Sequence, residues 1–128
     1  MKKTTATVLS LTLLALSSVV ASDQPHGSSW KEVKVAAVTA YTAGGPSGKG
    51  YVVVTFSSNG TGTPGCASGY PRDLVIDIST PGGGFAAAIA QSAKLSGMSV
   101  TVAGTGTCGV ASGTETMASI IESAGFRD

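Results

Sequence analysis

Charged and aromatic residues are scarce in this sequence of 128 residues. Lysine and arginine together number eight, aspartate and glutamate number seven, and aromatic side chains make up 5% of the chain. Nucleic-acid-binding proteins hold phosphates with a basic surface, and anionic lipids attract clusters of lysine and arginine. The formal net charge is +1 and no basic cluster is present. The sequence therefore predicts no nucleic-acid partner and no attraction to an anionic lipid surface.

Histidine is almost absent, which removes the common catalytic arrangements. The single histidine is His26, and a Ser–His–Asp triad needs a histidine that is held in place. Zinc sites need about four ligands. One histidine and two cysteines provide fewer than that number. A glycosidase would need two acidic groups in one cleft, and the sequence does not pair any of Asp73, Asp77, Glu115 and Glu122. We predict that the protein is not an enzyme and holds no metal and no cofactor.

Long hydrophobic runs are missing, apart from one near the start of the chain. Lys2 and Lys3 precede an apolar stretch at 8–20, and small residues lead up to Ala21. This pattern is typical of a bacterial secretory signal peptide, and the stretch is shorter than the roughly 20 residues of a membrane span. We therefore expect no membrane insertion. The predicted organisation is a signal peptide at 1–21, a flexible N-terminal segment at 22–31, one domain at 32–122 and a tail at 123–128.

Only two cysteines are present, Cys66 and Cys108. An even number of cysteines in an exported chain favours a disulfide bond. Such a bond would close a long loop and stabilise the fold by about 4 kcal/mol in the chain-entropy model. Two free thiols and a two-cysteine metal site are the alternatives. The disulfide predicts a secreted or periplasmic location in a bacterium.

Hydrophobic periodicity predicts five strands and one helix. Apolar residues alternate with polar ones in several short β-prone runs, and turn-forming residues separate these runs. An alanine-rich stretch follows Thr80 and Pro81, which suit the start of a helix. Gly97 suits its end. The expected strands are at 32–42, 51–56, 74–78, 98–103 and 116–122, and the expected helix is at 85–95.

The order of these elements predicts a mainly β fold with one helix. A helix between strands three and four of a five-stranded chain is the order of the OB-fold barrel. Closing the sheet into a barrel also removes exposed strand edges. An open α+β sandwich, with the helix across one face of the sheet, is the alternative.

The segment at 65–108 resembles the second half of a known protein family. It has a cysteine before strand three, an alanine-rich helix, a hydrophobic strand after Gly97 and the sequence G-T-G-T-C at 104–108. In these features it is similar to small secreted OB-fold proteins related to the B subunits of subtilase cytotoxin. The resemblance implies an OB-fold barrel, a homo-oligomeric ring of five subunits, and binding of sialylated glycans on cell surfaces. The family's sugar-binding serine has no match here, since Lys34 and Val35 occupy that neighbourhood.

Four residues are candidates for a ligand-binding site. Sugar sites combine an aromatic face with polar groups that bind hydroxyls, and buried polar groups need hydrogen-bond partners. Tyr70, Arg72 and Asp73 place an aromatic ring, a cation and an anion beside the predicted disulfide. Tyr41, at the end of the first predicted strand, is the fourth candidate. Each has a structural alternative, in which the tyrosines pack against the fold and Arg72 is a solvated charge.

Two functions are compatible with these features. The first is a secreted binding protein, similar to a toxin B subunit, that recognises glycans without covalent chemistry. The alternative is a stand-alone structural or partner-binding secreted protein without a glycan site. Its interaction surface would be formed by the loops at 57–70 and 104–114.

Overall fold

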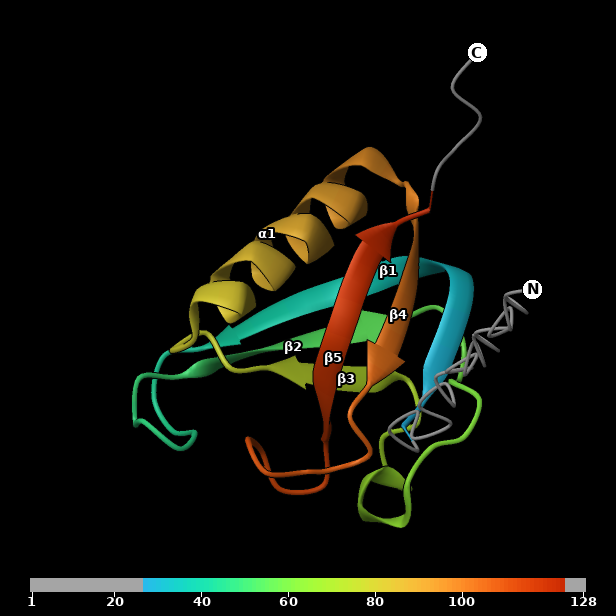
Figure 1. The fold of residues 1–128 in the computed structure, drawn as a ribbon. Coiled ribbons are helices and arrows are strands. Elements are labelled where there is room, and N and C mark those ends of the chain that lie inside the picture. Colours follow the sequence, from blue (N-terminus) through green and yellow to red (C-terminus); the bar gives the residue numbers. More distant parts are fainter. Residues whose placement is uncertain (1–26, 124–128) are drawn as a thin grey trace, which may run out of the picture.

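The computed structural model describes residues 27–123, which form a closed five-stranded barrel with one helix (Figure 1). The predicted signal peptide at 1–21, residues 22–26 of the expected flexible segment and residues 124–128 of the expected tail lie outside the described residues. The elements in chain order are β1 (Ser29–Tyr41), β2 (Tyr51–Phe56), the 3-10 turn η1 (Gly65–Ala67), β3 (Asp73–Ile76), α1 (Pro81–Ser96), β4 (Ser99–Gly104) and β5 (Glu115–Glu122).

The strand order around the barrel is β1-β2-β3-β5-β4, with α1 between β3 and β4 along the chain. All neighbouring strands are antiparallel except β3 and β5, which pair in parallel at only two positions. This arrangement confirms the prediction of a mainly β, OB-fold-like barrel with its helix between strands three and four. The open α+β sandwich is excluded because the sheet closes.

β1 closes the barrel because it belongs to both halves of the sheet. Its first part pairs with β4 and its second part pairs with β2. The register shifts between Trp30 and Val33, and again between Val35 and Ala37. Such irregularities bend a strand, and Glu32 at the first one has a φ of 52°. The bend lets one strand of 13 residues turn from one neighbour to the other.

β1 begins at Ser29 instead of position 32, so residues 29–31 belong to the barrel and not to a flexible segment. The reason is Trp30, which is 4% exposed. Its indole N–H donates to the carbonyl of Ser58 at 2.9 Å, and its ring lies 4.8 Å from that of Phe56. A tryptophan that gains both a hydrogen bond and an aromatic neighbour is stabilised in the core.

The core lies between the inner face of the sheet and α1. Buried and half-buried residues alternate along β2 and β4, as expected for strands with one face inward. Ala90 and Ala93 on α1 are fully buried against this core. Phe85, in the second turn of the same helix, is instead 75% exposed. Small alanine side chains therefore form the face by which the helix approaches the barrel.

α1 begins at Pro81, four residues before the predicted start. The hydroxyl of Thr80 caps it by accepting a hydrogen bond from the N–H of Gly83 at 3.0 Å. A side chain on Gly83 would overlap the carbonyl oxygen of Asp77. Gly83 therefore allows a close approach between the first turn of the helix and the residue that follows β3. At the other end, Gly97 has a φ of 70° and closes the helix.

The disulfide between Cys66 and Cys108 is present, with the two Cα atoms 6.1 Å apart. It joins the loop that follows β2 to the loop between β4 and β5, and it confirms the predicted pairing. A disulfide is consistent with an oxidising extracellular or periplasmic location. Within residues 27–123, no helix is both long and apolar enough to cross a membrane.

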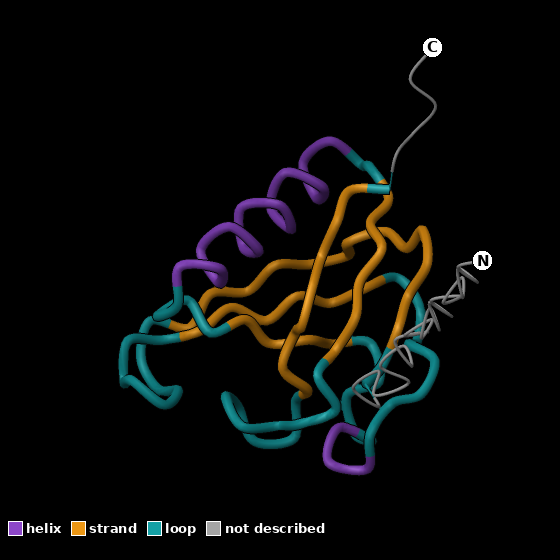
Figure 2. The backbone as a smooth tube through the Cα atoms, in the orientation of Figure 1, coloured by secondary structure: helices purple, strands orange, loops and turns teal. Residues whose placement is uncertain are grey.

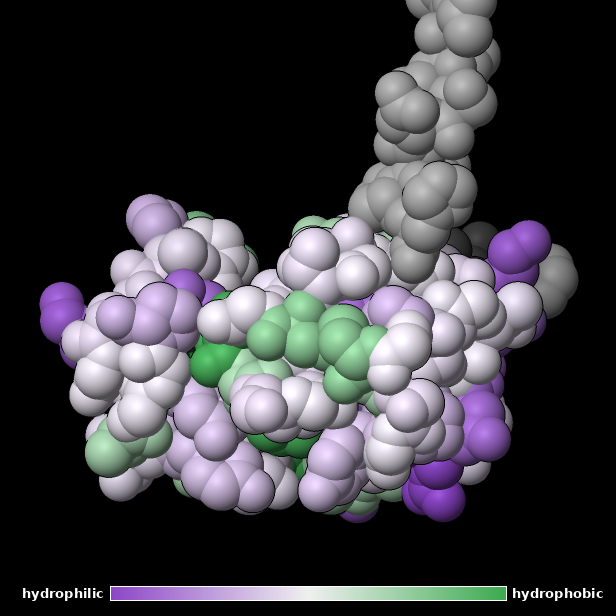
Figure 3. Space-filling model, turned by 90° about the horizontal axis from the view of Figure 1, so that it is seen from below, coloured by the Kyte–Doolittle hydropathy of each residue, from purple (hydrophilic) through white to green (hydrophobic). Residues whose placement is uncertain are grey.

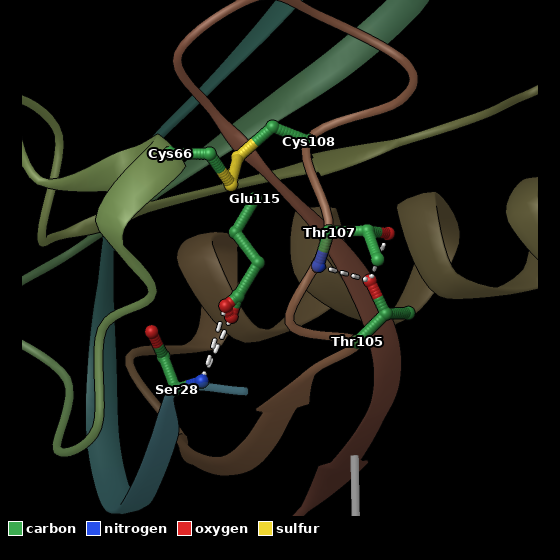
Figure 4. The surroundings of a disulfide bond; sticks show 6 residues. All are labelled: Ser28, Cys66, Thr105, Thr107, Cys108 and Glu115. Carbon is green, nitrogen blue, oxygen red and sulfur yellow. Dashed lines mark hydrogen bonds between the residues drawn. A yellow bond between two sulfur atoms is a disulfide. The ribbon is translucent and has the colours of Figure 1, made fainter. Parts of the chain in front are cut away.

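A buried carboxylate lies close to this disulfide (Figure 4). Glu115 is fully buried, and the backbone N–H of Ser28 donates to its two carboxylate oxygens at 2.7 and 3.1 Å. A Cβ on Gly104 would overlap the same carboxylate. The backbone N–H of Gly104 in turn donates to the carbonyl of Ser28 at 2.8 Å. These contacts connect the residue before β1 to the last residue of β4 and the first residue of β5.

Substitution of Gly104 by alanine tests this arrangement. The added methyl group must displace the Glu115 carboxylate, so we expect the free energy of unfolding to fall by about 1–3 kcal/mol, as for other overpacked sites. Denaturant unfolding measures the change. The control is Gly109→Ala, because nothing lies within 4 Å of a Cβ at that position. Equal stability of the two variants would contradict the close packing of Gly104 on Glu115.

Removal of the disulfide tests its contribution to stability. We expect the double variant Cys66→Ser, Cys108→Ser to lose about 2–5 kcal/mol of unfolding free energy, because the unfolded chain regains the freedom of the open loop. Thermal unfolding, compared with the oxidised protein in the same buffer, gives the measurement. A melting temperature unchanged by the double substitution would show that the bond does not stabilise the fold.

Candidate functional site

The three tyrosines of the chain meet at one pocket on the outer face of the barrel. The pocket has a volume of about 330 Å³ and lies where β1, β2 and β3 meet the loops. The long loops gather on the lower side of the barrel, away from most of α1 (Figure 2). We call this site the tyrosine pocket. Its lining consists of Tyr41, Tyr51, Val53, Tyr70, Asp73, Ala111, Ser112 and Thr114.

Tyr41 and Tyr51 form one wall. They are the last residue of β1 and the first of β2, and they lie opposite each other in the antiparallel pair. Their rings are stacked, with centroids 4.8 Å apart and planes inclined by 21°. The ring of Tyr51 also lies against the β1–β2 loop, since a Cβ on Gly44 or Gly45 would be 3.5 Å from a ring carbon. The hairpin thus fixes the orientation of both aromatic faces.

Asp73 supplies the only carboxylate of the lining. It is the first residue of β3, lies opposite Thr55 of β2, and is half-buried. Its backbone N–H donates to the carbonyl of Tyr70 at 3.2 Å. No side-chain hydrogen bond or ion pair engages its carboxylate within residues 27–123. Among the described residues, no buried side-chain oxygen or nitrogen lacks a hydrogen-bond partner. Because the Asp73 oxygens have no partner, they are not buried and remain accessible to a ligand.

Tyr70 and the turn at 111–114 form the opposite wall. The backbone N–H of Thr114 donates to the carbonyl of Ala111 at 3.2 Å, which closes the turn. Gly113 in this turn has a φ of 80°, and a Cβ on it would lie 3.5 Å from the ring of Tyr70. The disulfide joins both parts of this wall, because Cys66 lies four residues before Tyr70 and Cys108 three residues before Ala111.

Figure 3 shows the molecule from the side on which these loops lie. Hydrophobic side chains gather around a hollow in the middle of this face, and the most hydrophilic side chains lie near its edges. Tyr41 and Tyr70 keep 47% and 54% of their surface exposed. Exposed aromatic side chains that gather in one place on a folded domain mark a candidate binding surface.

The structure brings together three of the four predicted site residues. Tyr41, Tyr70 and Asp73 line the tyrosine pocket, whereas Arg72 does not. The Nε–H of Arg72 donates to the carbonyl of Phe56 at 3.1 Å. Arg72 lies in the turn before β3, and this hydrogen bond engages its side chain outside the pocket. Whether the three lining residues bind a ligand stays a prediction.

Sequence reasoning missed Tyr51 and the hydroxyls of Ser112 and Thr114. Tyr51 could have been found from the sequence. The predicted hairpin places the start of its second strand, where Tyr51 lies, opposite the end of its first strand, where Tyr41 lies. The two hydroxyls had no such signal, because the turn at 111–114 is far from Tyr70 in the sequence and lies beside it only in the folded barrel.

A second pocket, of about 390 Å³, lies between the start of α1, the end of β3 and β5. Asp77 is its only acidic or basic residue. The backbone N–H and the hydroxyl of Ser79 both donate to the Asp77 carboxylate, at 2.9 and 2.5 Å. The carboxylate is thus engaged in the turn before α1, and the pocket contains hydroxyl residues but no aromatic ring. Within residues 27–123, no group of three or more histidine, cysteine or acidic residues could hold a metal ion.

Comparisons of the chain with protein-family models, with curated proteins and with solved structures find no match. The barrel supports the OB-fold-like architecture that the resemblance implies. The relationship to toxin B subunits stays a prediction.

The turn before α1 gives a prediction about protonation. The two hydrogen bonds from Ser79 lower the pKa of Asp77 below its ordinary value, because they stabilise the carboxylate. Because the pKa of Asp77 is lower in the folded protein than in the unfolded chain, ionised Asp77 stabilises the fold at pH values above its unfolded-state pKa. This stabilisation is lost as the pH falls through the folded-state pKa. We expect Ser79→Ala to raise the pKa of Asp77, as measured by an NMR titration of its carboxyl carbon. An unchanged titration would show that Ser79 does not hold the carboxylate.

Proposed function

We propose that this protein is a secreted, non-enzymatic carbohydrate-binding protein whose site is the tyrosine pocket. The observation that carries the proposal is the convergence of all three tyrosines on one open pocket that also presents hydroxyls and a carboxylate. Aromatic faces bury the C–H surface of a sugar ring. Carboxylate and hydroxyl oxygens then bind the sugar hydroxyls that point away from the ring face.

The position of the pocket supports the proposal. OB-fold barrels bind oligosaccharides and oligonucleotides on the face of strands two and three, between the loop after strand one and the loop after strand four. The tyrosine pocket has residues from β2 and β3, and its walls are the end of the β1–β2 hairpin and the loop between β4 and β5. Its volume is at the lower end of the range for small-ligand sites, roughly 300–1,000 Å³. One or two sugar units would suit such a site.

The chemistry of the lining favours binding over hydrolysis. Glycosidases use two carboxyl groups on either side of the scissile bond. The tyrosine pocket offers Asp73 alone, and the fully buried Glu115 is held by the backbone N–H of Ser28. No pair of acidic groups therefore faces a bound sugar. An oligomeric ring that presents several such pockets would raise the avidity for a cell surface, in keeping with the resemblance to toxin B subunits.

Glycan-array binding by tyrosine variants tests the proposal. We expect Tyr70→Ala and Tyr41→Ala to weaken binding of the best array ligand about tenfold or more, which corresponds to about 1.4 kcal/mol for each ring. Phe85→Ala is the matched control, because Phe85 is an exposed aromatic residue on α1, outside the pocket. Arg72→Ala should also bind normally, since Arg72 does not line the pocket.

Two results would contradict this assignment. Loss of binding in Phe85→Ala or Arg72→Ala, with the tyrosine variants unaffected, would place the glycan site elsewhere. A complete array without any ligand would favour the alternative of a stand-alone structural or partner-binding protein.

A further inference from the structure

We infer that the tyrosine pocket selects saccharides that carry a protonated amino group and disfavours acidic saccharides, with Asp73 as the residue that sets this preference. The inference rests on the proposed carbohydrate-binding function and concerns the charge of the sugar. It differs from the sialylated ligands that the family resemblance implies.

The first argument is the charge of the lining. Asp73 is its only acidic residue, and the lining contains no lysine, arginine or histidine. A sialic acid or another acidic sugar would bring its carboxylate into a pocket that already holds one. Like charges that approach each other at a partly buried site repel more strongly than in bulk water. An acidic ligand would also need an arginine fork or several N–H donors, and no basic side chain of the lining provides them.

The second argument is the placement of the basic residues. Residues 27–123 contain five: Lys31, Lys34, Lys49, Arg72 and Lys94. Lys34 donates to the carbonyl of Gly97 at the end of α1, and Arg72 donates to the carbonyl of Phe56. Lys49 lies in the β1–β2 loop, is exposed, and does not line the pocket. Asp73 therefore has no basic partner inside the pocket.

The third argument is the match between the pocket and a cation. An ammonium group is attracted to the face of a tyrosine ring by about 0.5–2 kcal/mol, more when water is excluded. Three tyrosine rings and the accessible carboxylate of Asp73 line the same pocket, and two of these rings are stacked on each other. A pyranose with an amino substituent satisfies both features, because its C–H face stacks on an aromatic ring while its ammonium group pairs with the carboxylate.

Calorimetric titration with matched sugars tests the inference. The ligands are glucosamine oligosaccharides, the same oligomers with N-acetylated amines, and sialyllactose. We expect the amine-bearing oligomers to bind about tenfold or more tightly than the acetylated ones, and sialyllactose to bind most weakly. The amine preference should shrink as the salt concentration rises, because salt screens the charge pair.

Substitution of Asp73 identifies the residue responsible. In Asp73→Asn we expect the difference between the amine-bearing and acetylated oligomers to disappear, while the acetylated oligomers still bind. Lys49→Ala is the control and should keep the preference. If circular dichroism shows that Asp73→Asn does not fold, the salt dependence of the unaltered protein still tests whether a charge pair sets the amine preference.

The outcomes separate the two proposals. Equal or tighter binding of sialyllactose, an amine preference that persists in Asp73→Asn, or a preference insensitive to salt would overturn this inference while leaving carbohydrate binding intact. Tetramethylammonium that competes as well as the amine-bearing oligomers would show a bare cation site without sugar recognition, which also overturns it. No binding of any of the three saccharides, with an empty glycan array, would reject carbohydrate binding itself.

Discussion

The disulfide between Cys66 and Cys108 is the constraint on which the candidate site depends. The loops it joins are rich in glycine, serine and threonine and make few regular backbone pairs. Left unlinked, such loops would lose much conformational entropy on taking one arrangement. The bond instead holds Tyr70 and the turn at 111–114 near each other, so that they form one wall of the tyrosine pocket. The barrel supplies the opposite wall through the paired ends of β1 and β2.

Much of the fold could be predicted from the sequence because its signals are local. The alternation along β2 and β4, the alanine-rich helix and Gly97 at its end all appear as expected. The misplaced start of β1 depends on contacts between distant residues, because Trp30 packs on Phe56 and donates to Ser58. The early start of α1 depends instead on local contacts, since Thr80 caps the helix and Gly83 packs on the nearby carbonyl of Asp77. The burial of Glu115 also depends on residues far away in the sequence. A glutamate gives no local sign that Ser28 and Gly104 will enclose its side chain.

The candidate site was predictable in part for a similar reason. Tyr70 and Asp73 could be found because they lie beside a cysteine, and Tyr41 because it ends a strand. Arg72 shares this neighbourhood in the sequence, yet it lies in the turn before β3 and donates to the carbonyl of Phe56. Position along the chain therefore indicated the region of the site but not which side chains face the pocket. The turn at 70–73 decides that, and it is closed by a hydrogen bond from the backbone N–H of Asp73 to the carbonyl of Tyr70.

The central claim is that the tyrosine pocket is where this barrel binds its ligand. The most direct measurement is an NMR titration of isotope-labelled protein with a glucosamine oligosaccharide, following the backbone amide and tyrosine ring signals. We expect the largest shifts at Tyr41, Tyr51, Tyr70, Asp73 and the turn at 111–114, with α1 unaffected. Shifts concentrated instead around the pocket at the start of α1, with the tyrosine rings unchanged, would contradict it.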